Sequence, residues 1–256
     1  MTVVIDTRSD LTLETARRVG WQHENVRLSD RVMVAMAEGR DRLLRVLEHD
    51  PEITIYGVTT GAGQMAKTRL NPEERRGWAK MSPVGAATSW GDPLPERVVR
   101  MIVLARLTNF VEGHAAVSPA IAQGVAAMLG GAMMPVVPAR GQGGAGEILS
   151  LSHLFMDLVE QVEPEEKDVM CLVNGSPSAT GLVTDAALVA EHRLQVAAEI
   201  LALSFEAFNA PLGHLAQELE GYWNNPHDGW ALSTLRGLVG GGHGGERRSY
   251  QAPVSY

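Results

Sequence analysis

A tyrosine at the head of a glycine- and threonine-rich segment is the residue of this chain best suited to chemistry. Residues 56–63 read Tyr-Gly-Val-Thr-Thr-Gly-Ala-Gly and follow the short apolar run at residues 53–55. Glycine permits left-handed backbone and threonine hydroxyls bond nearby backbone groups, so this composition predicts a loop. If cationic or dipolar neighbours stabilised its phenolate, Tyr56 could remove a proton from a bound molecule. A buried tyrosine before an ordinary turn is the alternative.

Two further segments could hold another part of a ligand. Residues 141–153 read Gly-Gln-Gly-Gly-Ala-Gly-Glu-Ile-Leu-Ser-Leu-Ser-His, a glycine-rich loop that runs into a helix. Backbone N–H groups at a helix start are free to bind an anion, although glycine clusters also occur in flexible connectors. The third segment, Asn174-Gly175-Ser176, follows an apolar run and alone indicates an ordinary turn.

Helical spacing dominates the elements that must position these segments. Apolar residues recur at threes and fours along residues 32–47 and 99–111. The run Asn71-Pro72-Glu73-Glu74 predicts a helix start, because it combines a capping side chain, a first-turn proline and a glutamate three residues after the cap. Residues 180–208 are apolar on several faces, which predicts a long helix in a bundle or a subunit interface. Strand signals are limited to residues 3–5 and 53–55. The fold class is therefore mainly α.

Composition narrows the class of protein. The chain has 256 residues, 45% of them apolar, and a formal charge of −8 without a basic patch, which argues against a nucleic-acid partner. The one cysteine, Cys171, excludes an internal disulfide. The first residues do not resemble a signal peptide, and no apolar run is long enough to span a membrane. No group of residues has the spacing of a metal site. We expect a cytoplasmic protein without a metal.

Together the three segments resemble the aromatic amino acid (histidine/phenylalanine) ammonia-lyase family. Residues 56–63 are similar to the family's Tyr-Gly-Val-Asn-Thr-Gly-Phe-Gly loop, whose tyrosine is the base that removes a substrate proton. Residues 143–153 follow the signature Gly-Ala-Ser-Gly-Asp-Leu-Ala-Pro-Leu-Ala-His without gaps, and residues 174–176 resemble the family's Asn-Gly-Thr. The resemblance implies that Tyr56 is the base. It also implies a set of substrate-binding residues: Gly61, Ser82, Gly144, Ala145, Gly146, Asn174 and Gln251.

The sequence departs from the family at positions that matter for its chemistry. In the family, the Ala-Ser-Gly tripeptide cyclises into a methylidene-imidazolone electrophile, and the serine loses water to give the methylidene carbon. That serine is Ala145 here, and an alanine methyl cannot be dehydrated. We therefore expect no prosthetic group and no other cofactor. A substrate-contacting histidine of the histidine-specific branch corresponds to Pro83, and a second catalytic tyrosine to Val254.

Length is the other departure, because family members are roughly twice as long. The resemblance implies an N-terminal ammonia-lyase-like domain at residues 1–170 and the truncated start of the central helical bundle at residues 171–256. We expect a separate chain to supply the C-terminal half of that bundle, giving a hetero-oligomer. A homo-oligomer that rebuilds the bundle is the second option.

Two function classes follow from this resemblance. The first is a lyase-like enzyme subunit of a specialised biosynthetic pathway, acting on a small amino-acid-derived substrate by elimination, isomerisation, dehydration or cyclisation. Relatives without the prosthetic group cleave betaine-type histidine derivatives, which makes this class plausible. The alternative is a catalytically inactive structural or regulatory subunit of a lyase-like complex. The residues Ala145, Pro83 and Val254 favour it, because each replaces a residue that the family uses in its active site.

Overall fold

The structure, a computed structural model, describes residues 1–131, 133–141 and 146–246. Helices dominate it, in agreement with the predicted fold class. They are α1 (Leu13–Gly20), α2 (Asp30–His49), α3 (Pro72–Ala79), α4 (Glu96–Thr108), α5 (Pro119–Met128), α6 (Ile148–Gln161), α7 (Asp168–Val173), α8 (Pro177–Ala207), α9 (Glu220–Trp223) and α10 (Pro226–Leu238). The strands are β1 (Thr2–Ile5), β2 (Asn25–Leu28), β3 (Trp90–Pro93) and β4 (Pro138–Arg140).

The chain forms two compact units, Met1–Ala186 and Ala187–Tyr256. The division predicted after residue 170 marks where the family's central bundle begins. Compact units are a different criterion, so that division stays a prediction. Helix α8 begins in the first unit and ends in the second. It closely matches the long helix that the sequence predicted at residues 180–208.

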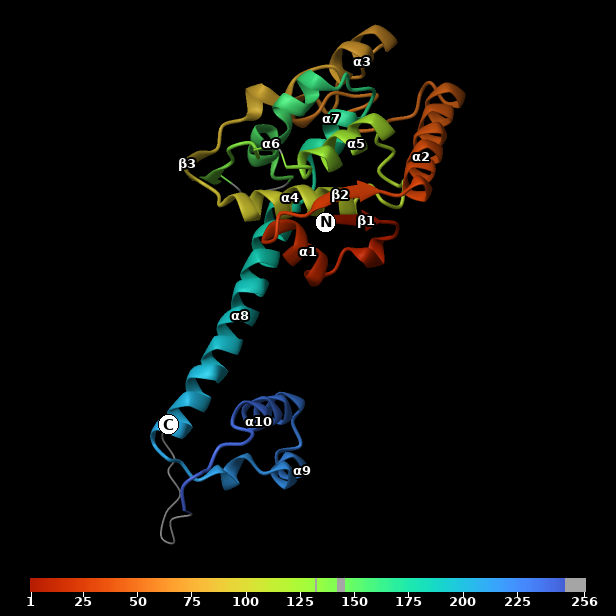
Figure 1. Cartoon of the computed structure of the whole chain (residues 1–256). Helices are drawn as coiled ribbons and strands as arrows, with labels where there is room; N and C mark the ends of the chain where they lie inside the picture. The colour runs from red at the N-terminus through yellow and green to blue at the C-terminus, as the bar shows by residue number, and fades with distance from the viewer. Residues whose placement is uncertain (132, 142–145, 247–256) are drawn as a thin grey trace. The chain divides into compact units, whose positions relative to one another are not determined.

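A short parallel sheet and α4 organise the first unit. Strand β1 pairs with β2, with Ile5 opposite Leu28, and α1 connects the two strands and packs on α4 (Figure 1). The guanidinium of Arg100 on α4 is buried and donates hydrogen bonds to the backbone oxygens of Val19, Glu24 and Leu129. Its pKa is lowered by burial. One side chain thereby satisfies carbonyls at the ends of several elements around α4.

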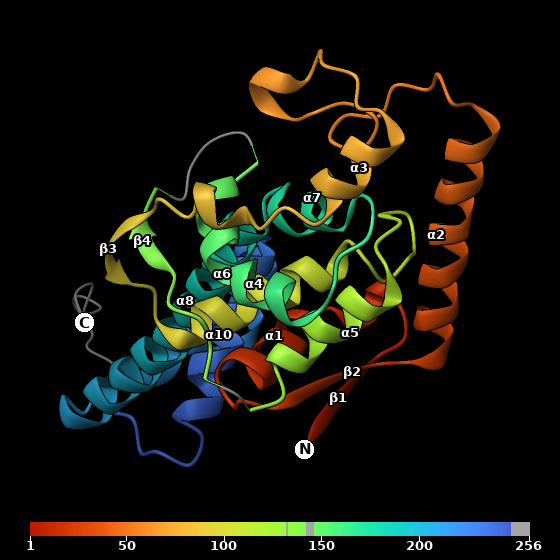
Figure 2. The same cartoon turned by 90° about the horizontal axis from the view of Figure 1, so that it is seen from above.

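Helix α2 stands at one edge of the first unit in both views (Figures 1 and 2). It meets the turn at Gly113 by direct backbone contact, and a Cβ on Gly39 would lie 1.9 Å from the Gly113 oxygen. Gly113 itself has φ of +70°, and its own Cβ would lie 2.2 Å from the Ala35 oxygen. Both glycines are therefore required for this close approach.

The start of α7 is fixed by buried charge. The Asp168 carboxylate is fully buried and accepts hydrogen bonds from the N–H groups of Ser118 (2.8 Å) and Glu165 (3.0 Å). Buried Arg40 of α2 donates to the Ala116 oxygen at 3.2 Å and lies 4.0 Å from Asp168. These bonds hold α7, whose other face lines the site described below, against α2 and the start of α5.

The second unit has a small core and much exposed apolar surface. Its core cluster consists of the buried residues Ala202, Phe205, Ala210, Leu215 and Val239. Large apolar side chains of the same unit face solvent, namely Ile200, Leu203, Phe208, Trp223, Trp230 and Leu238. Within the described part of the chain, no helix combines the length and apolar character needed to cross a lipid bilayer.

The strand predicted at residues 53–55 is wrong. These residues have no strand partner. The Ile55 N–H, which in a strand would bond to a neighbouring strand, donates instead to the Thr59 hydroxyl at 2.7 Å. The same hydroxyl donates to the Ile53 oxygen at 2.8 Å. Threonine therefore closes this segment into a turn rather than an extended strand. The predicted strand at residues 3–5 is confirmed as β1.

Candidate active site

Tyr56 projects from a loop in which Gly57 adopts the left-handed backbone conformation that favours glycine. Gly57 has φ of +69°, and a Cβ there would lie 2.7 Å from the Met170 methyl carbon. The Tyr56 side chain is 52% exposed, and its hydroxyl oxygen accepts a hydrogen bond from the Gly63 N–H at 2.8 Å. An N–H aimed at the phenol oxygen is suited to stabilising negative charge there. The loop thus presents an accessible phenol with a donor already at its oxygen.

Asn174 directly follows α7 and begins the turn into α8. Its side-chain amide donates to the Met170 oxygen at 3.0 Å, which fixes the orientation of the side chain along the last turn of the helix. Gly175 follows with φ of +85°, a value that favours glycine. The Asn174-Gly175 pair therefore forms a turn, as the sequence indicated, and the Asn174 amide on it is half-buried.

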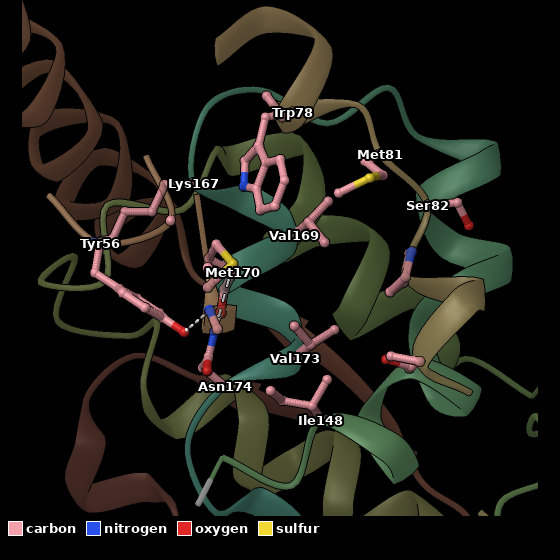
Figure 3. Close-up of a pocket in the computed structure, with 17 residues that line it drawn as sticks. Tyr56, Trp78, Met81, Ser82, Ile148, Lys167, Val169, Met170, Val173 and Asn174 are labelled. Atoms are coloured by element: carbon pink, nitrogen blue, oxygen red, sulfur yellow. Dashed lines mark hydrogen bonds between the residues drawn. The ribbon is translucent and has the colours of Figure 1, made fainter. Parts of the chain in front are cut away.

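Tyr56 and Asn174 line one cavity of about 240 Å³. Figure 3 shows Met170 and Asn174 beside the Tyr56 ring, and Ser82 on the opposite side of the cavity. The lining is mostly apolar, with Trp78 and Met81 from the α3 segment and Ile148 from α6. Val169 and Val173 of α7 complete this apolar wall. The cavity is suited to a small molecule with an apolar body and a few polar groups.

The sequence-predicted site residues fall into four sets. Tyr56, Ser82 and Asn174 lie on the same cavity. Gly61 is buried in the Tyr56 loop, where its N–H donates to the Thr68 oxygen at 3.0 Å, and it is not among the lining residues. Gly146 lies beside Asn174, since a Cβ on it would be 3.2 Å from the Asn174 Oδ1. The predictions at Gly144, Ala145 and Gln251 lie outside the described residues.

Ser82 has a structural partner as well as a place on the cavity. It precedes the short 3-10 turn Pro83–Ala86, and its hydroxyl accepts a long hydrogen bond of 3.4 Å from the Val84 N–H. Pro83 also lines the cavity, at the position that corresponds to the family's histidine. Pro83 contributes an apolar ring to that side of the cavity.

Sequence reasoning missed several lining residues. Trp78 and Met81 reach the cavity from the α3 segment, and Lys167 and Met170 from the start of α7; no motif distinguishes them in the sequence. The Lys167 amino group donates to the Ala115 oxygen at 2.7 Å, which leaves two of its three donors for other acceptors. Among the described residues, no group of three or more His, Cys, Asp and Glu side chains is arranged to hold a metal ion.

Cys171 lies on the core side of α7, away from this chemistry. Its thiol donates to the Ala115 oxygen at 3.3 Å, and burial raises the pKa of the thiol to about 11. We expect Ellman's reagent at about pH 8 to leave the folded protein unlabelled and to react fully after unfolding in guanidinium chloride, because only the thiolate is nucleophilic. Equal labelling rates before and after unfolding would contradict this placement.

Comparison with known proteins agrees with the resemblance seen in the three segments. The model of the aromatic amino acid lyase family matches residues 11–159. Histidine ammonia-lyase from Geobacillus thermodenitrificans is 27% identical over 229 residues, which cover 80% of this chain and 45% of that protein. A probable histidine ammonia-lyase from Halobacterium salinarum is 27% identical across 93% of this chain and 50% of its own length. This chain spans about half the length of the curated relatives it matches.

Solved structures show the same fold. Tyrosine aminomutase from Streptomyces globisporus superposes with a TM-score of 0.81 at 25% identity, covering 95% of this chain and 50% of that one. Ergothionase from Treponema denticola superposes with a TM-score of 0.79 at 18% identity, covering 92% of this chain and 52% of that one.

Proposed function

This chain belongs to the aromatic amino acid lyase family, and on that basis we propose that it is a lyase-like enzyme subunit that works without the methylidene-imidazolone group. Tyr56 is the base, Asn174 binds the substrate, and the substrate is a small amino-acid-derived molecule. The observation that carries the proposal is the placement of Tyr56 and Asn174, which are far apart in the sequence, on one mostly apolar cavity. The Gly63 N–H at the phenol oxygen supports the assignment of the base.

The residues of the tripeptide position do not fit the family's prosthetic group. The methylidene carbon requires a side chain that can lose water, and Ala145 carries only a methyl group. The proposed chemistry therefore does not use that group. What remains is proton transfer by the phenol and hydrogen bonding by backbone and side-chain amides.

The chemistry open to such a site begins with removal of a proton from carbon. The Tyr56 phenolate takes the proton and becomes the phenol, and the electron pair of the broken C–H bond stays on the substrate. In an elimination that pair forms a C=C bond while a leaving group departs with its own bonding electrons. In an isomerisation the proton returns at another carbon. Without an electrophile for the amine, this scheme suits a leaving group better than ammonia.

We also propose that further helices complete the site. The relatives are about twice as long as this chain, and apolar side chains are exposed along α8, among them Val183, Leu194 and Leu203. Such a surface favours contact with a partner. A separate chain that supplies the C-terminal half of the bundle fits this surface, and a second copy of this chain is the other arrangement.

Two measurements together test the proposal. The native mass of the chain is determined alone and after co-expression with the protein encoded beside it, and we expect a stable mixed complex. That complex is then incubated with free amino acids and with betaine-type histidine derivatives, and products are identified by liquid chromatography and mass spectrometry. We expect one alkene, isomer or cyclic product. A well-formed complex that converts none of these compounds would contradict an enzymatic role.

The competing proposal is an inactive structural or regulatory subunit. The alanine at position 145 and the proline at position 83 favour it, because both remove groups that the family uses. The half-exposed Tyr56 phenol argues against it, since phenylalanine would fill the same place at the cavity wall. On this alternative the complex forms, and its activity is unchanged when Tyr56 is replaced.

A further inference from the structure

The turn that carries Asn174 joins two helix ends. Helix α7 ends at Val173 and α8 begins at Pro177, so the last carbonyls of one helix and the first N–H groups of the other lie within a few residues. These groups have no partners inside their own helices. How they are satisfied determines how firmly Asn174 is held.

Arg106 of α4 satisfies the carbonyl side. Its guanidinium is 2% exposed and donates to the Cys171 oxygen at 2.7 Å and to the Asn174 backbone oxygen. Burial lowers the pKa of Arg106 to about 10, and the negative charge of Glu147 acts against that shift. None of the ion pairs found among the described residues includes Arg106. Its two terminal nitrogens bond the backbone around Asn174, whereas its buried Nε–H has no hydrogen-bond partner.

Glu147 satisfies the N–H side. Its carboxylate is buried and accepts hydrogen bonds from the N–H groups of Ser178 (2.6 Å) and Ala179 (2.8 Å), in the first turn of α8. A carboxylate at this end of a helix is also favoured by the helix dipole. Glu147 adopts φ of +46°, in the left-handed region that non-glycine residues rarely occupy. This conformation coincides with the hydrogen bonds that its carboxylate accepts and with those that its backbone oxygen accepts from the Leu151 N–H and the Ser150 hydroxyl.

Glu147 also connects the turn to the tripeptide position. It directly follows Gly146, which lies against the Asn174 side-chain oxygen. We propose that Arg106 and Glu147 are a positioning pair for Asn174: one holds the carbonyl side of the turn and the other the N–H side, so that the Asn174 amide faces the cavity in one orientation. This inference rests on the proposed function, because it assigns the pair's purpose to a substrate-binding Asn174.

The first test needs no substrate. The change Glu147→Gln keeps the size of the side chain but leaves one oxygen acceptor for two N–H groups. Hydrogen–deuterium exchange followed by mass spectrometry on the full chain should show faster exchange in peptides that span Asn174 to Ala179. The matched control is Glu163→Gln, which makes the same change at an exposed carboxylate bound by Lys80. Unchanged exchange at this turn in Glu147→Gln would overturn the inference.

The second test separates positioning from general stability. In the active complex, Glu147→Gln should lower kcat/KM by about 10- to 100-fold, the size expected when a binding group is misplaced. The double variant Glu147→Gln/Asn174→Ala should be no slower than Asn174→Ala alone, because Glu147 then has nothing left to position. If the double variant instead shows the product of the two single-variant losses in kcat/KM, Glu147 acts on stability or at a place other than Asn174. That result would overturn the proposal.

Two milder variants test the same inference if Glu147→Gln destabilises the fold. Glu147→Asp retains the charge and should recover part of the activity lost in Glu147→Gln, and Arg106→Lys, which cannot bind two carbonyls in the same geometry, should show the same dependence on Asn174. Failure of this inference differs from failure of the proposed function. If only this inference fails, turnover still depends on Tyr56, and the losses in kcat/KM from the Glu147 and Asn174 variants multiply. If the proposed function fails, turnover does not depend on Tyr56.

Discussion

Replacing Tyr56 with phenylalanine is expected to reduce turnover in the active complex by about 10²- to 10⁴-fold, the contribution typical of a general base. Phenylalanine retains the ring that lines the cavity and loses the hydroxyl that takes the proton. The hydrogen bond from the Gly63 N–H is also lost, but it is exposed to solvent, so we expect the free energy of unfolding to change by less than about 1 kcal/mol. Turnover is measured by product formation, and unfolding by urea titration.

A tyrosine outside the site provides the matched control. Tyr222 is 85% exposed and lies in the second unit, and Tyr222→Phe removes the same hydroxyl without touching the cavity. We expect wild-type turnover for this variant. If Tyr56→Phe kept the wild-type rate as well, Tyr56 would not be the base.

Replacing Gly39 with alanine is expected to cost about 3 kcal/mol of unfolding free energy or more, at the upper end for overpacking. The new methyl group would lie 1.9 Å from a backbone oxygen at Gly113, which no side-chain rotation can relieve. Helix α2 would have to move away, and with it Arg40, which bonds the backbone at Ala116. Thermal unfolding should shift downward by roughly 5–10 °C.

The control for this change is another helical glycine. Gly77 in α3 has no heavy atom within 4 Å of its would-be Cβ. Gly77→Ala should be neutral or stabilising by up to about 1 kcal/mol, since alanine is the better helix former. Equal stability of the Gly39 and Gly77 variants would show that α2 does not pack as described.

The helices were predictable because their signals are local. Asn71 caps α3 as predicted, and the Glu74 carboxylate accepts the Asn71 N–H at 2.7 Å in a complete capping box. Ser118-Pro119 begins α5, and the long apolar pattern became α8. Caps and periodic apolar residues act within one or two turns, so the sequence alone contains what is needed.

The strands were less accessible to prediction, because pairing depends on distant segments. Strand β2 is four residues long, too short for a clear alternation, and its partner β1 lies across α1. Strand β3 contains a glycine and a proline, which are depleted in strands. At residues 53–55 the apolar composition indicated a strand, but the Ile55 N–H donates to the Thr59 hydroxyl and not to a neighbouring strand.

The site was predictable only in part, and mainly through resemblance. Tyr56, Ser82 and Asn174 were identified from motifs and lie on one cavity. The apolar wall formed by Trp78, Met81 and Met170 has no motif, because those side chains come together only in the folded chain. The roles of Arg106 and Glu147 at the ends of the Asn174 turn depend on two three-dimensional contacts: α4 with the end of α7, and the segment before α6 with the start of α8.

The central claim is that the Tyr56 phenol transfers a proton at a substrate carbon without a prosthetic group. The most direct measurement uses a substrate deuterated on carbon, and NMR follows the breaking of its C–D bonds in the active complex. We expect the wild-type complex to break one C–D bond, with the deuterium lost to water or moved to another carbon, and the Tyr56→Phe complex to do so about 10²- to 10⁴-fold more slowly. Equal rates in the two complexes, or product formation that leaves every C–D bond intact, would contradict this claim.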